Sequence, residues 1–180
     1  AVDALLDYSV RRQIPVVLCT TGLSEEQLAH VKRASASVAV LKSANMSLGI
    51  NVISKLLKEA ARTLADAGFD IEIVEKHHNQ KVDAPSGTAL ALADAINEEM
   101  GGRYEYVYDR SGVREKRSSG QIGIQAVRGG SIVGEHEVIF AGTDEVIEIK
   151  HTAYSKAIFA KGALQAAKYL AGKPAGWNEM

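Results

Sequence analysis

Residues 75–89 read Glu-Lys-His-His-Asn-Gln-Lys-Val-Asp-Ala-Pro-Ser-Gly-Thr-Ala, and this stretch decides how the chain is interpreted. The residues just before it, 70–75, alternate in polarity, which predicts a strand. Apolar residues after it recur at the spacing of one helix face: Ala89, Leu92, Ala93, Ile96 and Met100. The polar cluster therefore lies on a strand-to-helix loop, with the N-terminus of a helix directed back at it.

This loop has the chemistry of an anion site. The first N–H groups of a helix lack partners and carry the positive end of its dipole. Gly87 leaves room for an anion, Ser86 and Thr88 add hydroxyl groups, and Lys81 adds a positive charge. Histidines that titrate near neutral pH lie beside them. The pattern predicts a pocket for a small carboxylate or phosphate with a proton donor next to it. The alternative is that the two histidines lie on a solvated loop and that Pro-Ser-Gly-Thr is an ordinary helix start.

Composition narrows the class of protein. The 180 residues are 46% hydrophobic, enough for one core or for one domain and part of another. The net charge of −1 gives no indication of a nucleic-acid or membrane partner. The single cysteine, Cys19, excludes an internal disulfide and fits a reducing compartment, so we expect a cytoplasmic protein. No apolar run reaches transmembrane length.

The first part of the chain predicts a parallel α/β arrangement. A short helix starting at Val2 precedes the apolar strand 16–19, which is typical of a strand buried on both faces. Residues 24–27 form a capping box that begins a second helix, and 38–41 predict the next strand. This alternation is half of a doubly wound, Rossmann-like sheet. No Gly-x-Gly-x-x-Gly turn follows any strand of the chain.

The later part predicts an α+β region with a mixed, largely antiparallel sheet. A helix over 51–67 and the strand, loop and helix around 75–89 come first, followed by strand 104–108 and a basic loop over 109–120. That loop is expected to be solvated, the alternative being that it borders the anionic substrate or a neighbouring subunit. Strands 121–127, 131–140 and 146–151 then predict a meander with a tight hairpin turn at 128–130. The last helix is expected to bury one face, with a loosely packed tail after it: Phe159, Ala163, Ala166, Ala167 and Leu170.

The motif from His77 to Ala89, His-His-x-x-Lys-x-Asp-Ala-Pro-Ser-Gly-Thr-Ala, resembles the signature of the dihydrodipicolinate reductase family. The likeness extends over essentially all 180 residues, including 20–22, 43–47 and 123–136. It implies that 1–46 and 156–180 are a remnant of a discontinuous dinucleotide-binding domain, and that 47–155 bind substrate and mediate oligomerisation. The family's glycine-rich turn would then precede residue 1, and turnover by this chain alone is expected to be poor.

The resemblance also implies a reaction. Family members reduce 4-hydroxy-tetrahydrodipicolinate (dihydrodipicolinate), a cyclic dicarboxylate, with NADH or NADPH in the diaminopimelate route of lysine biosynthesis, and a homotetramer is usual. His77 and Lys81 are implied as catalytic residues, and His78, Gly87 and Thr88 as contacts to the substrate. Contacts to the cofactor are implied for two turns: Cys19, Thr20 and Thr21, and Ser43, Ala44, Asn45 and Met46. Cys19 stands where the family usually has glycine.

Other roles and other functions stay open at this point. Asp83 is expected to orient the loop or Lys81, and His136 and His151 are expected to be ordinary strand histidines. A metal-dependent hydrolase using His77, His78 and Asp83 is disfavoured, because neighbouring residues in an extended stretch point to opposite sides. A non-catalytic dicarboxylate-binding and oligomerisation module, and a complete small α/β protein, are the remaining alternatives.

Overall fold

A computed structural model describes residues 1–43 and 45–179, which form two compact units. Residues 1–51 and those from 157 onward make the first unit, and Val52–Lys156 make the second. One unit holds a parallel sheet and the other a mixed sheet, each with helices, so the predicted α/β class is confirmed.

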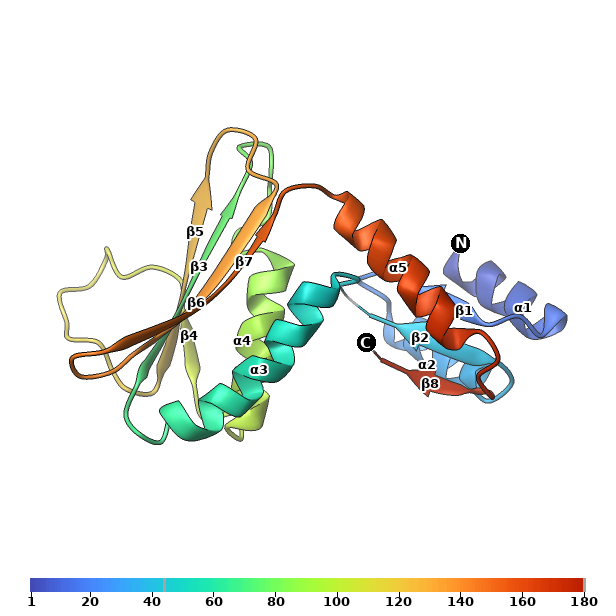
Figure 1. Ribbon diagram of the computed structural model, residues 1–180, viewed down its shortest axis with the longest axis horizontal. Helices are drawn as coiled ribbons and strands as arrows, with labels where there is room; N and C mark the ends of the chain where they lie inside the picture. Colours follow the sequence, from blue (N-terminus) through green and yellow to red (C-terminus); the bar gives the residue numbers. More distant parts are fainter. Residues whose placement is uncertain (44, 180) are drawn as a thin grey trace. The chain divides into compact units, whose positions relative to one another are not determined.

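The first unit is built on a parallel sheet of order β1-β2-β8 (Figure 1). Its strands are β1 (Val16–Leu18), β2 (Ala39–Lys42) and β8 (Gly176–Asn178), and its helices are α1 (Val2–Arg12), α2 (Glu25–Ser35) and α5 (Ala157–Leu170). Ser24 caps α2 with the predicted capping box, because its side chain accepts from the Gln27 N–H while the Gln27 side chain accepts from the Ser24 N–H.

The core of this unit has a layer on each face of the sheet. Leu6 of α1 and Val31 of α2 pack with alternate residues of β1 and β2, including Val40. On the other face, Ala166 and Leu170 of α5 pack with Leu41. Burial on both faces explains why these strands are continuous apolar runs.

Two expectations for the C-terminal part are wrong. The tail is not loosely packed, because Trp177 lies in β8, which pairs in parallel with β2. The buried side of α5 includes Gly162, Ala166 and Leu170, whereas Phe159 is 40% exposed. Apolar spacing alone did not show that glycine, the smallest residue, marks the side of closest packing.

The second unit is a five-stranded sheet of order β4-β5-β3-β6-β7, with α3 and α4 on one side (Figure 1). Its elements are α3 (Leu48–Leu64, which starts in the first unit), β3 (Asp70–His77), α4 (Gly87–Glu99), β4 (Glu105–Val107), β5 (Gln121–Arg128), β6 (Gly134–Ala141) and β7 (Val146–Ala153). The Arg62 guanidinium donates to Glu99 at 2.6 Å and thereby ties α3 to α4.

The predicted meander is wrong in one respect. β6 and β7 do form an antiparallel pair, but β5 and β6 are not neighbours, because β3 lies between them. β3 is parallel to β5 and antiparallel to β6. The expected hairpin turn instead hydrogen-bonds to the end of β3, with the Gly129 N–H donating to the His77 carbonyl at 2.9 Å. A turn motif shows where the chain reverses, but not which strand fills the space between its arms.

The central position of β3 determines what its side chains contact. Its residues alternate between buried and half-buried, and the buried set faces α4: Ile71, Ile73, Glu75 and His77. In the register of the sheet, Glu75 lies between Ala126 of β5 and His136 of β6, and His77 lies opposite Arg128. A carboxylate, two imidazoles and a guanidinium are thus brought to one buried face.

Two further segments differ from the sequence prediction. α3 begins at Leu48 rather than near residue 51, because the Ser47 hydroxyl accepts from the Ile50 N–H and caps the helix early. The basic loop over 109–120 is not simply solvated. Arg117 donates to Asp70 at 2.6 Å and to Glu72 at 2.8 Å, which fastens the loop to the start of β3.

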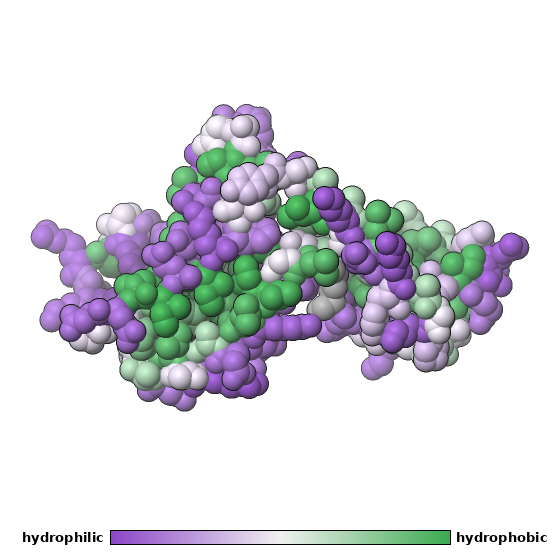
Figure 2. Space-filling model, viewed as in Figure 1, coloured by the Kyte–Doolittle hydropathy of each residue, from purple (hydrophilic) through white to green (hydrophobic). Residues whose placement is uncertain are grey.

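The surface view shows hydrophobic residues gathered along α3 (Figure 2). Val52 and Leu56 of α3, one helical turn apart, are 55% and 53% exposed. Within the described residues, no helix combines the length and apolar character that a membrane span requires.

Gly162 gives the first testable prediction. A Cβ at this position would lie 1.6 Å from the Met46 carbonyl oxygen, so Gly162→Ala forces α5 away from the segment after β2. Such overpacking typically costs about 1–3 kcal/mol, against a gain of about 1 kcal/mol from helix propensity. We therefore expect a lower free energy of unfolding for the first unit, measured by urea denaturation with Trp177 fluorescence.

Gly176→Ala is the matched control, because no atom lies within 4 Å of its Cβ position. We expect a change within about 0.5 kcal/mol for that variant. Equal midpoints for Gly162→Ala and the wild type would contradict the close approach of α5.

Candidate functional site

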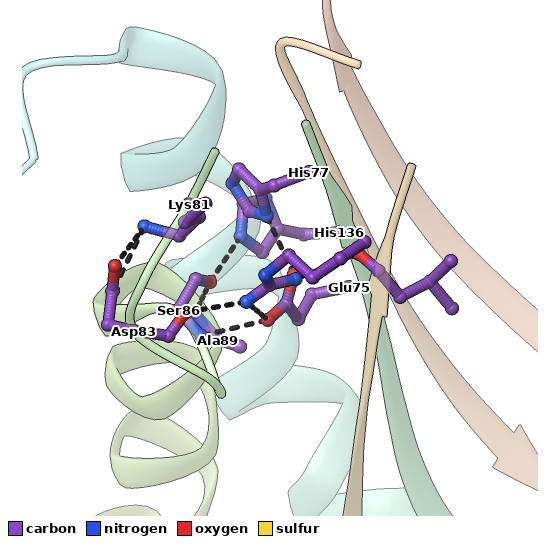
Figure 3. A network of polar contacts seen from close by, with 9 residues as sticks. Glu75, His77, Lys81, Asp83, Ser86, Ala89 and His136 are labelled. Atoms are coloured by element: carbon purple, nitrogen blue, oxygen red, sulfur yellow. Dashed lines mark hydrogen bonds and ion pairs between the residues drawn. The ribbon is translucent and has the colours of Figure 1, made fainter. Parts of the chain in front are cut away.

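The site lies where β3 leads into α4 (Figure 3). Glu75 and His77 project from β3, His136 projects from β6, and Lys81 and Asp83 lie on the loop between β3 and α4. Ser86 is the N-cap of α4, and its hydroxyl accepts from the Ala89 N–H at 3.1 Å. The cluster thus combines groups that can hold an anion with groups that can move a proton.

Glu75 is fully buried and accepts hydrogen bonds at both carboxylate oxygens. Arg128 donates to each oxygen, at 2.8 Å and 2.7 Å. His77 Nδ1 lies 2.6 Å from Oε2, and the Ser86 N–H donates to Oε1 at 2.9 Å. Burial by itself would raise the pKa of Glu75, but the hydrogen bonds from Arg128, His77 and Ser86 outweigh it and leave the pKa below its usual value. Glu75 is therefore the ionised partner of this cluster.

The contact with Glu75 sets the state of the His77 ring. An ionised carboxylate only accepts hydrogen bonds, so Nδ1 must carry the proton that it donates. The other ring nitrogen, Nε2, then has a lone pair in the neutral ring and a proton in the charged ring. Nε2 faces Gly134 of β6, where a Cβ would lie 3.1 Å away. A side chain at position 134 would therefore crowd Nε2, the ring nitrogen that does not contact Glu75.

His136 is a second buried imidazole of the site. Its Nε2 lies 2.9 Å from the Ser86 hydroxyl, and its ring meets the His77 ring edge-on with centroids 5.2 Å apart. Burial, reinforced by the nearby His77, lowers the pKa of His136 to about 4. At neutral pH this imidazole is uncharged, and it supports the helix cap rather than binding an anion by charge.

Lys81 holds a carboxylate already. Its ammonium donates to both oxygens of Asp83, at 2.8 Å and 2.9 Å. The hydrogen bond from Lys81 lowers the pKa of Asp83, and the backbone N–H of Gly87 contributes in the same direction. An internal carboxylate thus lies between the lysine and the helix N-terminus, where the sequence predicts an anion.

The remaining predicted substrate contacts lie close by. His78 is half-buried directly after β3, while Gly87, exposed, and Thr88 are the first residues of α4. The five predicted catalytic and substrate-binding residues therefore lie between the last residue of β3 and the second residue of α4: His77, His78, Lys81, Gly87 and Thr88.

The predicted cofactor contacts lie in the first unit, after two neighbouring parallel strands. Cys19, Thr20 and Thr21 follow β1 and are exposed. Although Cys19 is exposed as a residue, partial burial of its thiol raises the pKa of that group. Ser43 follows β2, and its N–H donates to the Leu18 carbonyl at 3.3 Å, which joins the two turns.

The rest of the second turn is a compact capping structure. The Asn45 side chain accepts from the Ser47 N–H at 2.8 Å, and its carbonyl accepts from the Ser43 hydroxyl at 2.8 Å. Met46 is buried, with 4% exposure. The prediction for Ala44 lies outside the described residues. Among the residues that are described, no cluster of three or more His, Cys, Asp or Glu side chains is arranged to hold a metal ion.

Sequence reasoning missed Glu75, Arg128 and His136 as members of the site. Glu75 precedes His77 by two positions on a strand, and residues at that spacing share a face. This spacing could have identified Glu75 as a neighbour of His77 from the sequence. Arg128 and His136 are brought in only because β3 separates β5 from β6, which the predicted hairpin had excluded.

Comparison with known families decides the identity of the chain. The family model described as dihydrodipicolinate reductase, N-terminus, matches residues 1–46, and the one described as dihydrodipicolinate reductase, C-terminus, matches 49–180. The chain belongs to the dihydrodipicolinate reductase family. The predicted resemblance is thereby confirmed, and the β3–α4 connection lies wholly within the C-terminal family region.

Curated relatives of the dihydrodipicolinate reductase family match over the full chain. The 4-hydroxy-tetrahydrodipicolinate reductase of Clostridium tetani is 54% identical over 180 residues, which is 70% of that protein. The protein of the same name from Caldanaerobacter subterraneus subsp. tengcongensis is 58% identical over 180 residues, or 71% of its length. A solved dipicolinate-bound dihydrodipicolinate reductase from Paenisporosarcina sp. TG-14 shares the fold, with a TM-score of 0.78 at 24% identity over 99% of this chain and 67% of that one.

The lowered pKa of His136 predicts a pH dependence of stability. Between about pH 6.5 and pH 4 the unfolded chain binds a proton at this residue and the folded chain does not. Stability present above pH 6.5 is therefore lost as the pH falls through this window, by about 2–3 kcal/mol. We expect His136→Phe to lose less stability over the window, in urea denaturation followed by circular dichroism.

His78→Gln is the matched control, because it removes the half-exposed histidine next to the cluster. We expect it to keep the wild-type slope between pH 6.5 and pH 4. An unchanged slope in His136→Phe would show that this imidazole is not held neutral by burial.

Proposed function

We propose that the chain is the substrate-binding part and part of the cofactor-binding region of a 4-hydroxy-tetrahydrodipicolinate reductase. The reaction is reduction of this cyclic dicarboxylate by NADH or NADPH to tetrahydrodipicolinate, in lysine biosynthesis. The family and the names of relatives at 54% and 58% identity support the activity. The observation that carries it in this chain is the cluster of His77, Lys81 and the α4 N-terminus on one loop.

Two carboxylates of the substrate need two kinds of partner. Lys81 supplies a formal positive charge, and Gly87 and Thr88 place their N–H groups in the first turn of α4, at the positive end of the helix dipole. Asp83 holds the Lys81 ammonium in place before substrate arrives. A substrate carboxylate then takes over contacts that Asp83 now makes, so little of the site has to be reorganised. His78, at the start of the same loop, borders the carboxylates.

Reduction also requires a proton. NADH or NADPH, when bound, would supply a hydride to one atom of a substrate double bond, and the negative charge left at the other end of that bond must be neutralised by a proton. His77 is suited to deliver that proton from Nε2, because Glu75 engages Nδ1 and leaves Nε2 as the nitrogen that changes state. Lys81 is a second donor and fixes the substrate beside the ring.

The turns after β1 and β2 fit a nicotinamide cofactor. Ligands of open α/β sheets bind outside the carboxyl ends of the parallel strands, which is where Cys19, Thr20, Thr21 and the segment of Ser43, Asn45 and Met46 lie. Ala44 belongs to the same proposed segment. No Gly-x-Gly-x-x-Gly turn occurs in the 180 residues, so we expect cofactor binding by this chain alone to be weak. Binding of the dicarboxylate is therefore a sharper first test than turnover.

A homotetrameric, cytoplasmic protein completes the proposal. The sheet face opposite α4 exposes Val127 by 44% and Val146 by 58%, and apolar side chains on an open sheet face favour association. The single free cysteine fits a reducing compartment. Sedimentation of the chain tests the assembly, and a monomer at all concentrations would contradict it.

Lys81→Met is the direct test of the dicarboxylate site. Removing the ammonium should weaken binding of pyridine-2,6-dicarboxylate, a planar analogue, by at least about tenfold, or 1.4 kcal/mol. The affinity is measured by isothermal titration calorimetry with a chelator present, which excludes binding through a contaminating metal.

Lys76→Met is the matched control, because Lys76 pairs with Glu135 on the opposite face of the sheet, at 3.4 Å. We expect its affinity for the analogue to equal that of the wild type. Equal affinities for Lys81→Met and the wild type would refute the proposed site on this loop.

A further inference from the structure

Resting on the proposed function, we infer that Glu75 and Arg128 are the positioning residues of the site. They hold His77, the Lys81 loop and the α4 N-terminus in one arrangement. Neither touches the proposed substrate position, and neither follows from the names of the relatives. The inference comes from the contacts of one buried carboxylate.

Every acceptor position of Glu75 is used, and only a carboxylate can fill the role. Each oxygen accepts two hydrogen bonds, one of them from Arg128. The second donor to Oε2 is His77, and the second donor to Oε1 is the Ser86 N–H. A glutamine would turn an NH₂ group toward two of these donors in either orientation. The network is therefore selective for a charge and not merely for a side chain of this size.

One part of the network determines the tautomer of His77. Because Glu75 accepts from Nδ1, the neutral imidazole keeps its proton there and presents the Nε2 lone pair beside Gly134. Without Glu75 as acceptor, nothing in this contact would hold the proton of the neutral ring on Nδ1 rather than on Nε2. The lone pair and proton of Nε2 are what a proton-transfer step uses, so Glu75 acts on the reaction through His77.

The other part fixes the anion site. Arg128 Nη2 bonds Glu75 and also donates to the Asp83 carbonyl at 2.6 Å. Asp83 in turn holds Lys81. The Ser86 N–H that donates to Glu75 belongs to the N-cap residue of α4. The ion pair thus connects β3 and β5 to the loop at Asp83 and to the N-cap residue of α4, and it places the lysine relative to the helix N-terminus.

The charged and titratable groups around His77 come from each surrounding element. Glu75 lies on β3, Arg128 on β5, His136 on β6, and Lys81 with Asp83 on the loop. Of these groups, Glu75 is the one within hydrogen-bond distance of the His77 ring, at 2.6 Å from Nδ1. The His136 ring packs edge-on against the His77 ring without a hydrogen bond between them. The state of the ring therefore reports on Glu75.

The test measures the His77 imidazole directly. In the chain labelled with ¹⁵N-histidine, we expect NMR at alkaline pH to show a protonated Nδ1 and an unprotonated Nε2. Glu75→Met, which offers Nδ1 no acceptor, should lose this pattern and weaken binding of pyridine-2,6-dicarboxylate at least tenfold. Glu135→Gln, a carboxylate change on the opposite face of the same sheet, is the matched control and should alter neither result.

A second variant covers the case in which Glu75→Met leaves the half-buried Arg128 without its carboxylate partner and the unit unfolds. The double variant Glu75→Met with Arg128→Met removes both charges and offers His77 no acceptor. We expect it to fold and to lose the Nδ1–H pattern. Wild-type ¹⁵N signals of His77 in both variants would overturn the inference.

Affinity separates this inference from the proposed function. If the wild type does not bind the dicarboxylate, the proposed substrate site fails, whereas the ¹⁵N pattern still decides whether Glu75 holds His77. If the wild type binds and both variants bind equally well, the substrate site stands and the positioning role of the ion pair is refuted.

Discussion

The ion pair between the buried Glu75 and the half-buried Arg128 is the interaction on which the rest of the site depends. Removing two charges from water is costly, and such a pair persists only where the geometry is good and the remaining hydrogen-bonding positions are filled. Here Arg128 binds both carboxylate oxygens, and His77 and the Ser86 N–H occupy what is left. The same contacts that compensate for burial therefore determine the direction of the imidazole, the loop and the helix N-terminus.

This interaction exists because β3 is a central strand. With β5 on one side and β6 on the other, a carboxylate on β3 lies within reach of an arginine and a histidine from different neighbours. α4 then closes the face, and its N-cap Ser86 contacts both Glu75 and His136. Sheet order, rather than any local motif, turns the scattered polar residues into one network. The loop that carries Lys81 only completes it.

Local patterns predicted much of the fold. The capping box at Ser24, the apolar strands of the first unit and the β3–loop–α4 connection follow from spacing and helix chemistry, and each is present. The position of β3 between β5 and β6 was missed, because hydrophobic alternation is the same for a central and an edge strand. Arg128 and His136 were missed for the same reason, since their roles depend on strand pairing. Glu75 was recognisable from its spacing to His77.

A crystal structure of the chain with pyridine-2,6-dicarboxylate tests the central claim most directly. We predict one carboxylate on Lys81 Nζ and the first N–H groups of α4, with the ring beside His77 Nε2. Lys81 should turn from Asp83 toward the ligand, while the contacts of Glu75 with Arg128, His77 and Ser86 stay as they are. A ligand bound away from this loop, or a Glu75 that leaves Arg128 to accommodate it, would contradict the account.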